Sequence, residues 1–216
     1  MYNKLIKASA HLRCRLSKKG GITMLDQEQV ISILKDAGAF LEGHFLLTSG
    51  RHSDRYLQCA KVFQDTRYAE PICEQIAECF KDFEVETVIG PAMGAIQLAY
   101  EVSRKLSCRN FFAEREDGKM TLRRGFAVTP GMRVLVVEDV VTTGGSAKEV
   151  IELVRAAGGE VVGVGAVVDR TGGKMDFGVP FHAALSLEVA SYESSECPIC
   201  KTGAPLVKPG SRKVIK

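Results

Sequence analysis

The sequence predicts an α/β protein with an open, mostly parallel five-stranded sheet flanked by helices. Between residues 85 and 189, short apolar runs rich in β-branched residues alternate with segments of helical periodicity. This alternation is typical of a parallel sheet covered by helices on both faces. With 216 residues, of which 45% are hydrophobic and 25% charged, the chain can bury one proper core. No apolar run approaches the ~18 residues that a membrane span requires, so no membrane contact is expected.

Charge and cysteine content narrow the function classes. The net charge is +3, but residues 1–25 contain six basic residues and no acidic one. The remaining 191 residues therefore carry three more acids than bases, and this argues against a general nucleic-acid-binding surface. The seven cysteines are odd in number and irregular in spacing. They indicate free thiols in a reducing compartment, so we expect a cytoplasmic protein.

The chain divides into an extension and one domain. Residues 1–25 form a basic extension, interrupted by a Gly-Gly break, that we expect to be dispensable. A transit peptide, a cloning-derived addition or a start codon placed too early would give the same pattern. The domain is expected to span residues 26–216. We call residues 26–62 together with the C-terminal tail the hood, and residues 63–190 the core.

The hood begins with a helix and a hairpin. Asp26 is expected to cap a helix that ends at Gly38. Two extended runs, 44–48 and 54–60, flank Ser49-Gly50-Arg51 and predict a hairpin. Its aromatic and apolar content suits a cap over a pocket, although an edge hairpin would have the same pattern.

The core alternates strands and helices. The expected elements are a helix over 65–82, a strand and tight loop over 87–95, a helix over 95–107, a strand over 110–113, a buried strand over 134–137, a helix ending near 155, and strands over 161–168 and 183–189.

The chemistry of the chain is concentrated where the strand 134–137 ends. Two acids, Glu138 and Asp139, follow that strand, and a helix begins soon after. Between them lie Val140, Val141, Thr142, Thr143, Gly144, Gly145 and Ser146. Glycines and hydroxyls at a helix N-terminus can hold a phosphate, whereas carboxylates suit the hydroxyls of a sugar. The combination predicts a ribose 5-phosphate site, because two acids ending an apolar strand serve no packing purpose.

This stretch resembles the signature for phosphoribosyl diphosphate (PRPP) of the type I phosphoribosyltransferases. The signature is an apolar strand, two acids, two apolar residues and a loop that here reads Thr-Thr-Gly-Gly-Ser. Neither the Walker loop nor the dinucleotide fingerprint occurs here. Residues Gly38 to Tyr56 are similar to the N-terminal hood of the orotate phosphoribosyltransferases, a branch of that family. Asp169-Arg170, at the end of the strand 161–168, matches a pair found in the same branch.

The resemblance implies an activity and a set of partners. The reaction is transfer of the 5-phosphoribosyl group from PRPP to N1 of orotate, giving orotidine 5′-monophosphate and pyrophosphate in UMP synthesis. Mg²⁺ is expected to bind through PRPP, with no direct protein ligand. A homodimer is also implied, in which a loop of each subunit reaches the site of the other.

The resemblance also assigns roles to residues. Glu138 and Asp139 would hold the ribose hydroxyls, with Asp139 counted among the catalytic residues. The loop from Thr142 to Ser146 would hold the 5′-phosphate, and Val140 and Val141 would also bind PRPP. Orotate would be bound by Thr142, Arg170 and Tyr56.

Residues 114–126 are expected to form a flexible loop, because they are polar and contain glycine. Arg115 and Lys119 match the spacing of an arginine and a lysine that act on pyrophosphate in the orotate branch. We therefore expect both to be catalytic and PRPP-binding. A further lysine and a histidine of that loop are missing here, and Arg123 or Arg124 could supply the charge instead.

Two rival functions share the PRPP half of the site. One is transfer to a purine base, which enzymes of this fold typically stack on an aromatic residue. Arg170 is better placed for a substrate carboxylate. The other is a non-catalytic PRPP sensor that binds nucleic acid, which the acidic body and Lys119 disfavour.

Cys197 and Cys200 form a single CxxC motif. It supplies two of the four ligands that zinc usually takes, no second pair accompanies it, and His182 stands alone. We interpret the motif as an incidental structural turn. A zinc site shared across a dimer and a redox pair are the alternatives.

Overall fold

The computed structural model describes residues 24–47 and 49–209. Its helices and strands are α1 (Gln27–Asp36), β1 (Phe40–Leu46), β2 (His52–Leu57), α2 (Thr66–Phe80), β3 (Thr87–Pro91), α3 (Ile96–Leu106), β4 (Arg109–Glu116), β5 (Lys119–Leu122), β6 (Arg133–Val141), α4 (Gly145–Ala156), β7 (Glu160–Asp169) and β8 (Phe181–Ser186). Three short 3₁₀ turns are η1 (Cys59–Gln64), η2 (Lys81–Phe83) and η3 (Cys200–Thr202). Residues 1–23 of the predicted extension lie outside the described residues.

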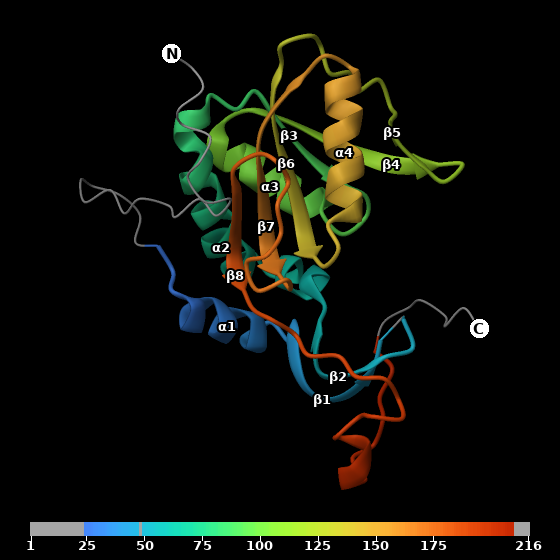
Figure 1. The fold of residues 1–216 in the computed structure, drawn as a ribbon. Helices are drawn as coiled ribbons and strands as arrows, with labels where there is room; N and C mark the ends of the chain where they lie inside the picture. Colours follow the sequence, from blue (N-terminus) through green and yellow to red (C-terminus); the bar gives the residue numbers. More distant parts are fainter. Residues whose placement is uncertain (1–23, 48, 210–216) are drawn as a thin grey trace.

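The central sheet has six strands in the order β5-β4-β3-β6-β7-β8 (Figure 1). Five of these strands, β4, β3, β6, β7 and β8, pair in parallel, which confirms the expected parallel sheet. Strand β5 adds an antiparallel edge. It arises from the segment 114–126, so the expectation of a flexible loop there was wrong. Asp117 and Gly118 both have positive φ, +50° and +81°. An Asp-Gly pair with this backbone favours a tight hairpin turn, and the polar residues around it pair as strands.

Helices cover both faces of the sheet, and β6 shows why. Leu135 and Val137 face the core formed with α1, α2 and α3. Val134 and Val136 face the second core, against α4. Because successive strand residues point to opposite faces, a continuous apolar run belongs in the middle of such a sandwich. In Figure 1, α4 lies in front of the sheet and α2 behind it.

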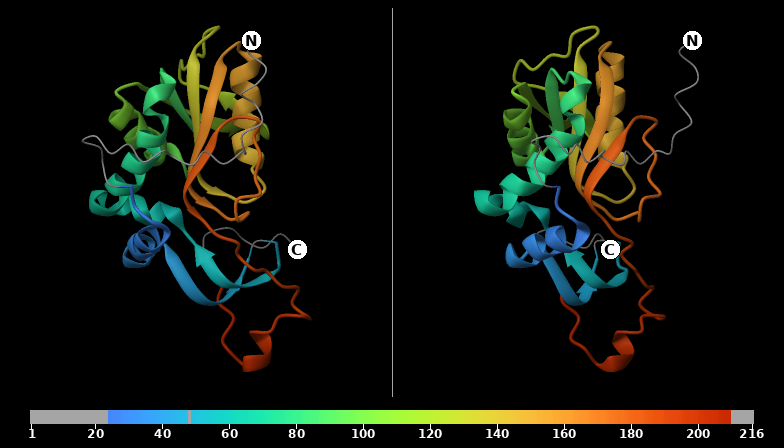
Figure 2. Two further views of the ribbon diagram at one scale, coloured as in Figure 1. Left: turned by 60° about the vertical axis from the view of Figure 1, so that its left-hand side comes forward. Right: turned by 90° about the vertical axis from the view of Figure 1, so that its left-hand side faces the viewer.

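The predicted hood helix and hairpin both form. Asp26 caps α1 and makes a capping box with Gln29. Strands β1 and β2 pair antiparallel, starting and ending a few residues earlier than expected. Isolated bridges attach the tail to this hairpin, at Phe45 with Val207 and at His52 with Tyr192. Figures 1 and 2 show the hairpin and the tail side by side, beyond the carboxyl ends of β6 and β7.

Strand β6 runs further than expected, so Glu138 and Asp139 lie within it and not after it. On one side, β7 pairs with β6 as far as Val141. On the other side, pairing with β3 ends at Val136. The last residues of β6 therefore have one open edge. The two carboxyl groups lie where the sheet opens toward the hood.

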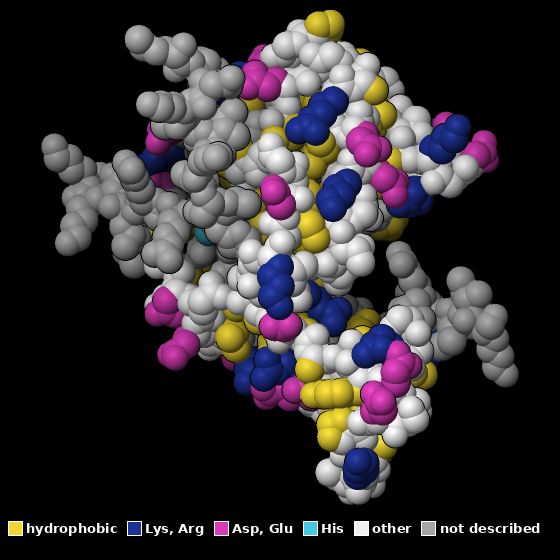
Figure 3. All heavy atoms as spheres, viewed as in Figure 1, with side chains coloured by type: hydrophobic (Ala, Val, Ile, Leu, Met, Phe, Trp, Pro, Cys, Tyr) yellow, Lys and Arg dark blue, Asp and Glu magenta, His cyan; other side chains and the backbone are white. Residues whose placement is uncertain are grey.

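The surface agrees with a mixed charge distribution. On the face shown in Figure 3, Lys and Arg side chains are interspersed with Asp and Glu and do not merge into one basic patch. Within residues 24–47 and 49–209, no helix has both the length and the apolar character needed to cross a membrane.

Candidate active site

A pocket of about 190 Å³ opens at the carboxyl end of β6. Its lining residues are Arg115, Glu138, Val140, Val141, Thr142, Thr143, Gly144, Gly145, Ser146 and Glu149. The fold thus brings together most of the residues that the sequence assigned to PRPP. Glu149, on α4, is a lining residue that sequence reasoning missed, because nothing in its local pattern distinguishes it from a solvent-exposed helix residue.

The N-terminus of α4 forms one wall of this pocket. Gly144 precedes the helix with φ +72°, and no side chain caps the first turn. A Cβ at Gly144 would lie 2.9 Å from Phe177 Cε1, so only glycine fits. The first N–H groups of the helix have no partner within it, and the helix dipole adds positive potential there. The loop is therefore built to hold an anion such as a phosphate.

Glu138 lines this pocket, whereas Asp139, the next residue of β6, lies outside the lining. Glu138 is 9% exposed. Its burial and the negative charge of Asp139 together raise the pKa of Glu138 to about 9. Asp139 is half-buried, and its Oδ1 accepts a hydrogen bond from the Val140 N–H at 2.9 Å.

Two other segments approach these acids closely. A Cβ at Gly94, in the loop after β3, would lie 2.6 Å from Asp139 Oδ2. On η1, burial and then the charges of Asp139 and Glu138 raise the pKa of the Cys59 thiol well above its usual range. The acids are thus enclosed by the β3 loop and by the turn that connects the hood to α2.

Of the two expected loop residues, only Arg115 lines this pocket. Its guanidinium donates to Glu149 at 2.8 Å and to the Gly118 carbonyl at 2.9 Å. Lys119 is exposed at the start of β5. Arg124 donates to Glu114 at 3.1 Å, and Arg123 forms an ion pair with Glu116 at 3.4 Å. These two arginines therefore engage acids of their own hairpin.

Arg170 lies half-buried at the end of β7, beside the end of β6. Its backbone N–H donates to the Val141 carbonyl at 2.9 Å. Its side-chain Nε is buried and has no hydrogen-bond partner among the described residues. Burial also lowers the pKa of Arg170. A guanidinium N–H left without a partner in this position suits an anionic ligand.

Asp169 is a structural residue whose importance the sequence did not reveal. It is fully buried and accepts hydrogen bonds from the Thr171 N–H and hydroxyl, the Gly173 N–H and the Ser186 hydroxyl, at 2.7–2.9 Å. These bonds fix the turn that carries Arg170. Tyr56, on β2, is half-buried with its ring 5.8 Å from that of Phe45 and does not line the pocket.

Cys197 and Cys200 have histidine neighbours that their interpretation as an incidental turn did not include. His44 and His52 lie beside both cysteines, and one ligand atom from each of the four falls within 4.8 Å of the others. The signal was the register of the hairpin. Leu46 pairs with His52, and a register shift lies between Glu42 and Phe45, so that His44 Nε2 reaches His52 Nδ1 at 3.0 Å.

Comparison with known proteins places this site in a family. The phosphoribosyl transferase domain matches residues 64–177. An orotate phosphoribosyltransferase of Caldanaerobacter subterraneus subsp. tengcongensis is 59% identical over 190 residues, covering 88% of this chain and all of that protein. One of Caldicellulosiruptor saccharolyticus is 57% identical with the same coverage. The crystal structure of orotate phosphoribosyltransferase from Aeropyrum pernix superposes with a TM-score of 0.62 at 27% identity, covering 73% of this chain and 93% of that one.

The raised pKa of Glu138 predicts a pH-dependent cost to stability. Because its pKa is raised in the folded state, folding favours the protonated form. That stability is complete below the ordinary pKa of 4.5 and is lost as pH rises toward about 9. Glu138→Gln does not ionise, so its melting temperature should exceed that of the parent by several degrees at pH 8.5. This corresponds to a few kcal/mol.

The same two proteins should melt at similar temperatures near pH 5. Glu152→Gln, an exposed position on α4, is the control and should match the parent at both pH values. A difference between Glu138→Gln and the parent that does not grow with pH would contradict the buried, proton-binding carboxyl.

Proposed function

Because this chain belongs to the orotate phosphoribosyltransferases, we propose that it transfers the 5-phosphoribosyl group of PRPP to N1 of orotate. The products are orotidine 5′-monophosphate and pyrophosphate, and the step serves pyrimidine nucleotide synthesis. The observation that carries this proposal is the pocket at the end of β6, where the uncapped N-terminus of α4 meets Glu138, with Asp139 next to it on the strand. Relatives that are more than half identical over nearly nine-tenths of this chain are named orotate phosphoribosyltransferases.

PRPP fits this pocket through its two kinds of polar group. The loop from Thr142 to Ser146 would bind the 5′-phosphate with its backbone N–H groups and hydroxyls. Glu138 and Asp139 would accept hydrogen bonds from the ribose hydroxyls, a role that a phosphate-binding loop cannot fill. The half-buried position of Asp139 leaves its carboxylate within reach of a ligand.

Mg²⁺ is the cofactor that we propose, held through the oxygens of PRPP. Glu138 and Asp139 are only two acids, fewer than the oxygen ligands that a site built from protein alone would need for this ion. Among the described residues, the one group of three or more candidate ligands lies elsewhere, in the hood. When bound, the ion would neutralise charge on the pyrophosphate.

The reaction asks the protein for alignment and charge stabilisation. The bond from C1 of ribose to the pyrophosphate oxygen breaks, and the oxygen leaves with the electron pair. N1 of orotate forms the new bond to C1, and the proton of N1 passes to the pyrophosphate or to solvent. Such a displacement needs positive groups where the leaving charge develops. Arg115 offers one from the wall of the pocket.

Lys119 is proposed to act on the leaving group of a neighbouring subunit. It is exposed within its own chain, at the projecting end of the β4–β5 hairpin, and it does not line the pocket there. A homodimer that shares this hairpin between subunits would place the Lys119 ammonium over the second pocket.

The described cysteines are free thiols, which suits a reducing compartment, and we propose a cytoplasmic enzyme.

Orotate recognition is proposed to depend on Arg170, with Thr142 and Tyr56 as further contacts. Orotate carries a carboxylate, and Arg170 offers a buried N–H without a partner at the adjoining strand end. The turn carrying this arginine is fixed by Asp169, so the guanidinium is positioned before the substrate arrives.

The choice of base tests the proposed function directly. The purified protein, with PRPP and Mg²⁺, should consume orotate in a spectrophotometric assay. It should leave adenine, guanine and hypoxanthine unreacted. Turnover of a purine with no loss of orotate would overturn the assignment, and binding of PRPP without turnover of any base would indicate a sensor.

Arg170→Ala should raise the orotate KM at least tenfold and leave PRPP affinity nearly intact. A charge-assisted hydrogen bond is worth roughly 1.5–3 kcal/mol, and a factor of ten needs about 1.4 kcal/mol. Steady-state kinetics in orotate and in PRPP separates the two effects. Arg155→Ala, at an exposed position near the end of α4, is the control. An unchanged orotate KM would move base recognition to other residues.

Lys119→Ala should lower kcat by about 10²–10³ and change KM less, since its charge matters most as pyrophosphate leaves. Mixing it with Asp139→Asn tests whether the hairpin is shared. If it is, half the dimers are mixed and each regains one intact site, so activity should approach about a quarter of the parent's. Failure to complement would show that each subunit closes its own site, and near-normal kcat in Lys119→Ala would remove the residue from the mechanism. Lys35→Ala, on α1, is the control.

A further inference from the structure

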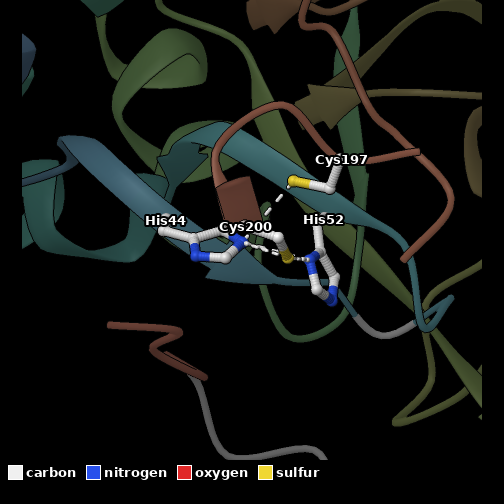
Figure 4. Close-up of side chains that lie close together, drawn as sticks. All are labelled: His44, His52, Cys197 and Cys200. Carbon is white, nitrogen blue, oxygen red and sulfur yellow. Dashed lines mark hydrogen bonds between the residues drawn. The ribbon is translucent and has the colours of Figure 1, made fainter. Parts of the chain in front are cut away.

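We propose that the hood contains a structural zinc site formed by His44, His52, Cys197 and Cys200. The site is separate from the phosphoribosyl-transfer pocket, since none of the four residues lines that pocket. Figure 4 shows the two imidazoles and the two thiols turned toward one another. The histidines come from the hairpin β1–β2, and the cysteines come from the tail, more than 140 residues later in the chain.

The spacing of the ligand atoms fits a tetrahedral ion. His44 Nε2 lies 3.0 Å from His52 Nδ1 and 3.6 Å from the sulfur of each cysteine. Cys200 Sγ lies 3.2 Å from His52 Nδ1. Zinc with N ligands at ~2.0–2.1 Å and S ligands at ~2.3 Å would separate ligand atoms by about 3.3–3.8 Å. Shifts of a few tenths of an ångström would therefore admit the ion.

A second hydrogen bond orients His44 toward this centre. Its Nδ1 lies 3.0 Å from the Ala204 carbonyl oxygen. A carbonyl only accepts, so Nδ1 carries the proton and the Nε2 lone pair points at the cluster. Metal-binding histidines characteristically donate their other N–H in this way. The tail thus supplies both the thiols and the group that orients the imidazole.

The donor set and its burial indicate zinc in a structural role. His44 and His52 are 4% exposed and Cys197 is 1% exposed, while Cys200 closes the site on the outside. Two sulfur and two nitrogen ligands in a tetrahedron are typical of zinc. Four protein ligands leave no open position for a substrate or water, so the site serves the fold and not catalysis.

The distal part of the hood, formed by the hairpin β1–β2 and the tail, needs such a crosslink because it adds little to the apolar core. Neither of the two hydrophobic cores includes a described residue between Leu41 and Tyr56 or beyond Leu187. Polar bonds hold the tail to the hairpin, among them the two backbone bonds of 2.8 Å between His52 and Tyr192 and the side-chain bonds of Arg51 and Ser53 to residues 190–193. Small lobes without a core are commonly stabilised by a metal or a disulfide.

The alternatives explain less of the geometry. A redox pair would use Cys197 and Cys200 but would give no reason for two buried histidines at hydrogen-bond distance from each other and from Cys200. A site shared across a dimer is not required, because one chain supplies all four ligands.

Metal analysis of the full-length protein, purified under reducing conditions, tests the site. We expect one zinc ion per chain by inductively coupled plasma mass spectrometry. Replacement by Co²⁺ should give the visible bands of tetrahedral cobalt and a thiolate charge-transfer band. Cys200→Ser should lose most of the metal. Cys108→Ser, which removes a half-buried thiol outside the hood, should keep it.

Chelation covers the case in which the Cys200→Ser variant fails to fold. A zinc-selective chelator should lower the melting temperature of the unmodified protein by several degrees, and added zinc should restore it. Three results would overturn the proposal: a reduced parent chain that takes up neither zinc nor cobalt, full zinc content in Cys200→Ser, or a Cys197–Cys200 disulfide in metal-free protein.

Discussion

The fold holds two neighbouring carboxyl groups at the end of its central strand, and the rest of the site is arranged around this constraint. Strand β6 continues past the end of its pairing with β3. Glu138 and Asp139 therefore lie on a part of β6 that pairs only with β7. Burying adjacent acids is unfavourable, and the raised pKa of Glu138 is the physical sign of that cost. Perturbed groups of this kind cluster at functional sites. A ligand that brings hydroxyl donors would stabilise the ionised form of these carboxyl groups.

Local patterns predicted the parts of the fold that local physics determines. The apolar run before Glu138, the Asp26 cap and the Thr-Thr-Gly-Gly-Ser loop each act over a few residues, and each appears as expected. The extent of β6 depends instead on pairing with β7, so the strand predicted from the local sequence ended too early. In the 114–126 segment, polarity and glycine content suggested a loop, whereas the Asp117-Gly118 turn signal indicates the hairpin that forms.

The hood cluster escaped prediction because its ligands are remote in sequence. Cys197 and Cys200 carry an obvious spacing, but His44 and His52 become neighbours only through the hairpin register and the path of the tail. Searching for a second CxxC therefore missed them. The hairpin β1–β2 lies beyond the carboxyl ends of β6 and β7 (Figure 1), the end of β6 at which the PRPP pocket opens.

The central claim is that the carboxylates of β6 bind PRPP, and calorimetric titration tests it most directly. PRPP with Mg²⁺ should bind the parent and a Glu152→Gln control with the same affinity. The double variant Glu138→Gln with Asp139→Asn should bind at least tenfold more weakly, because the ribose hydroxyls lose the Asp139 carboxylate and the Glu138 carboxyl group as acceptors. Unchanged PRPP affinity in the double variant, with the fold intact by circular dichroism, would contradict the account.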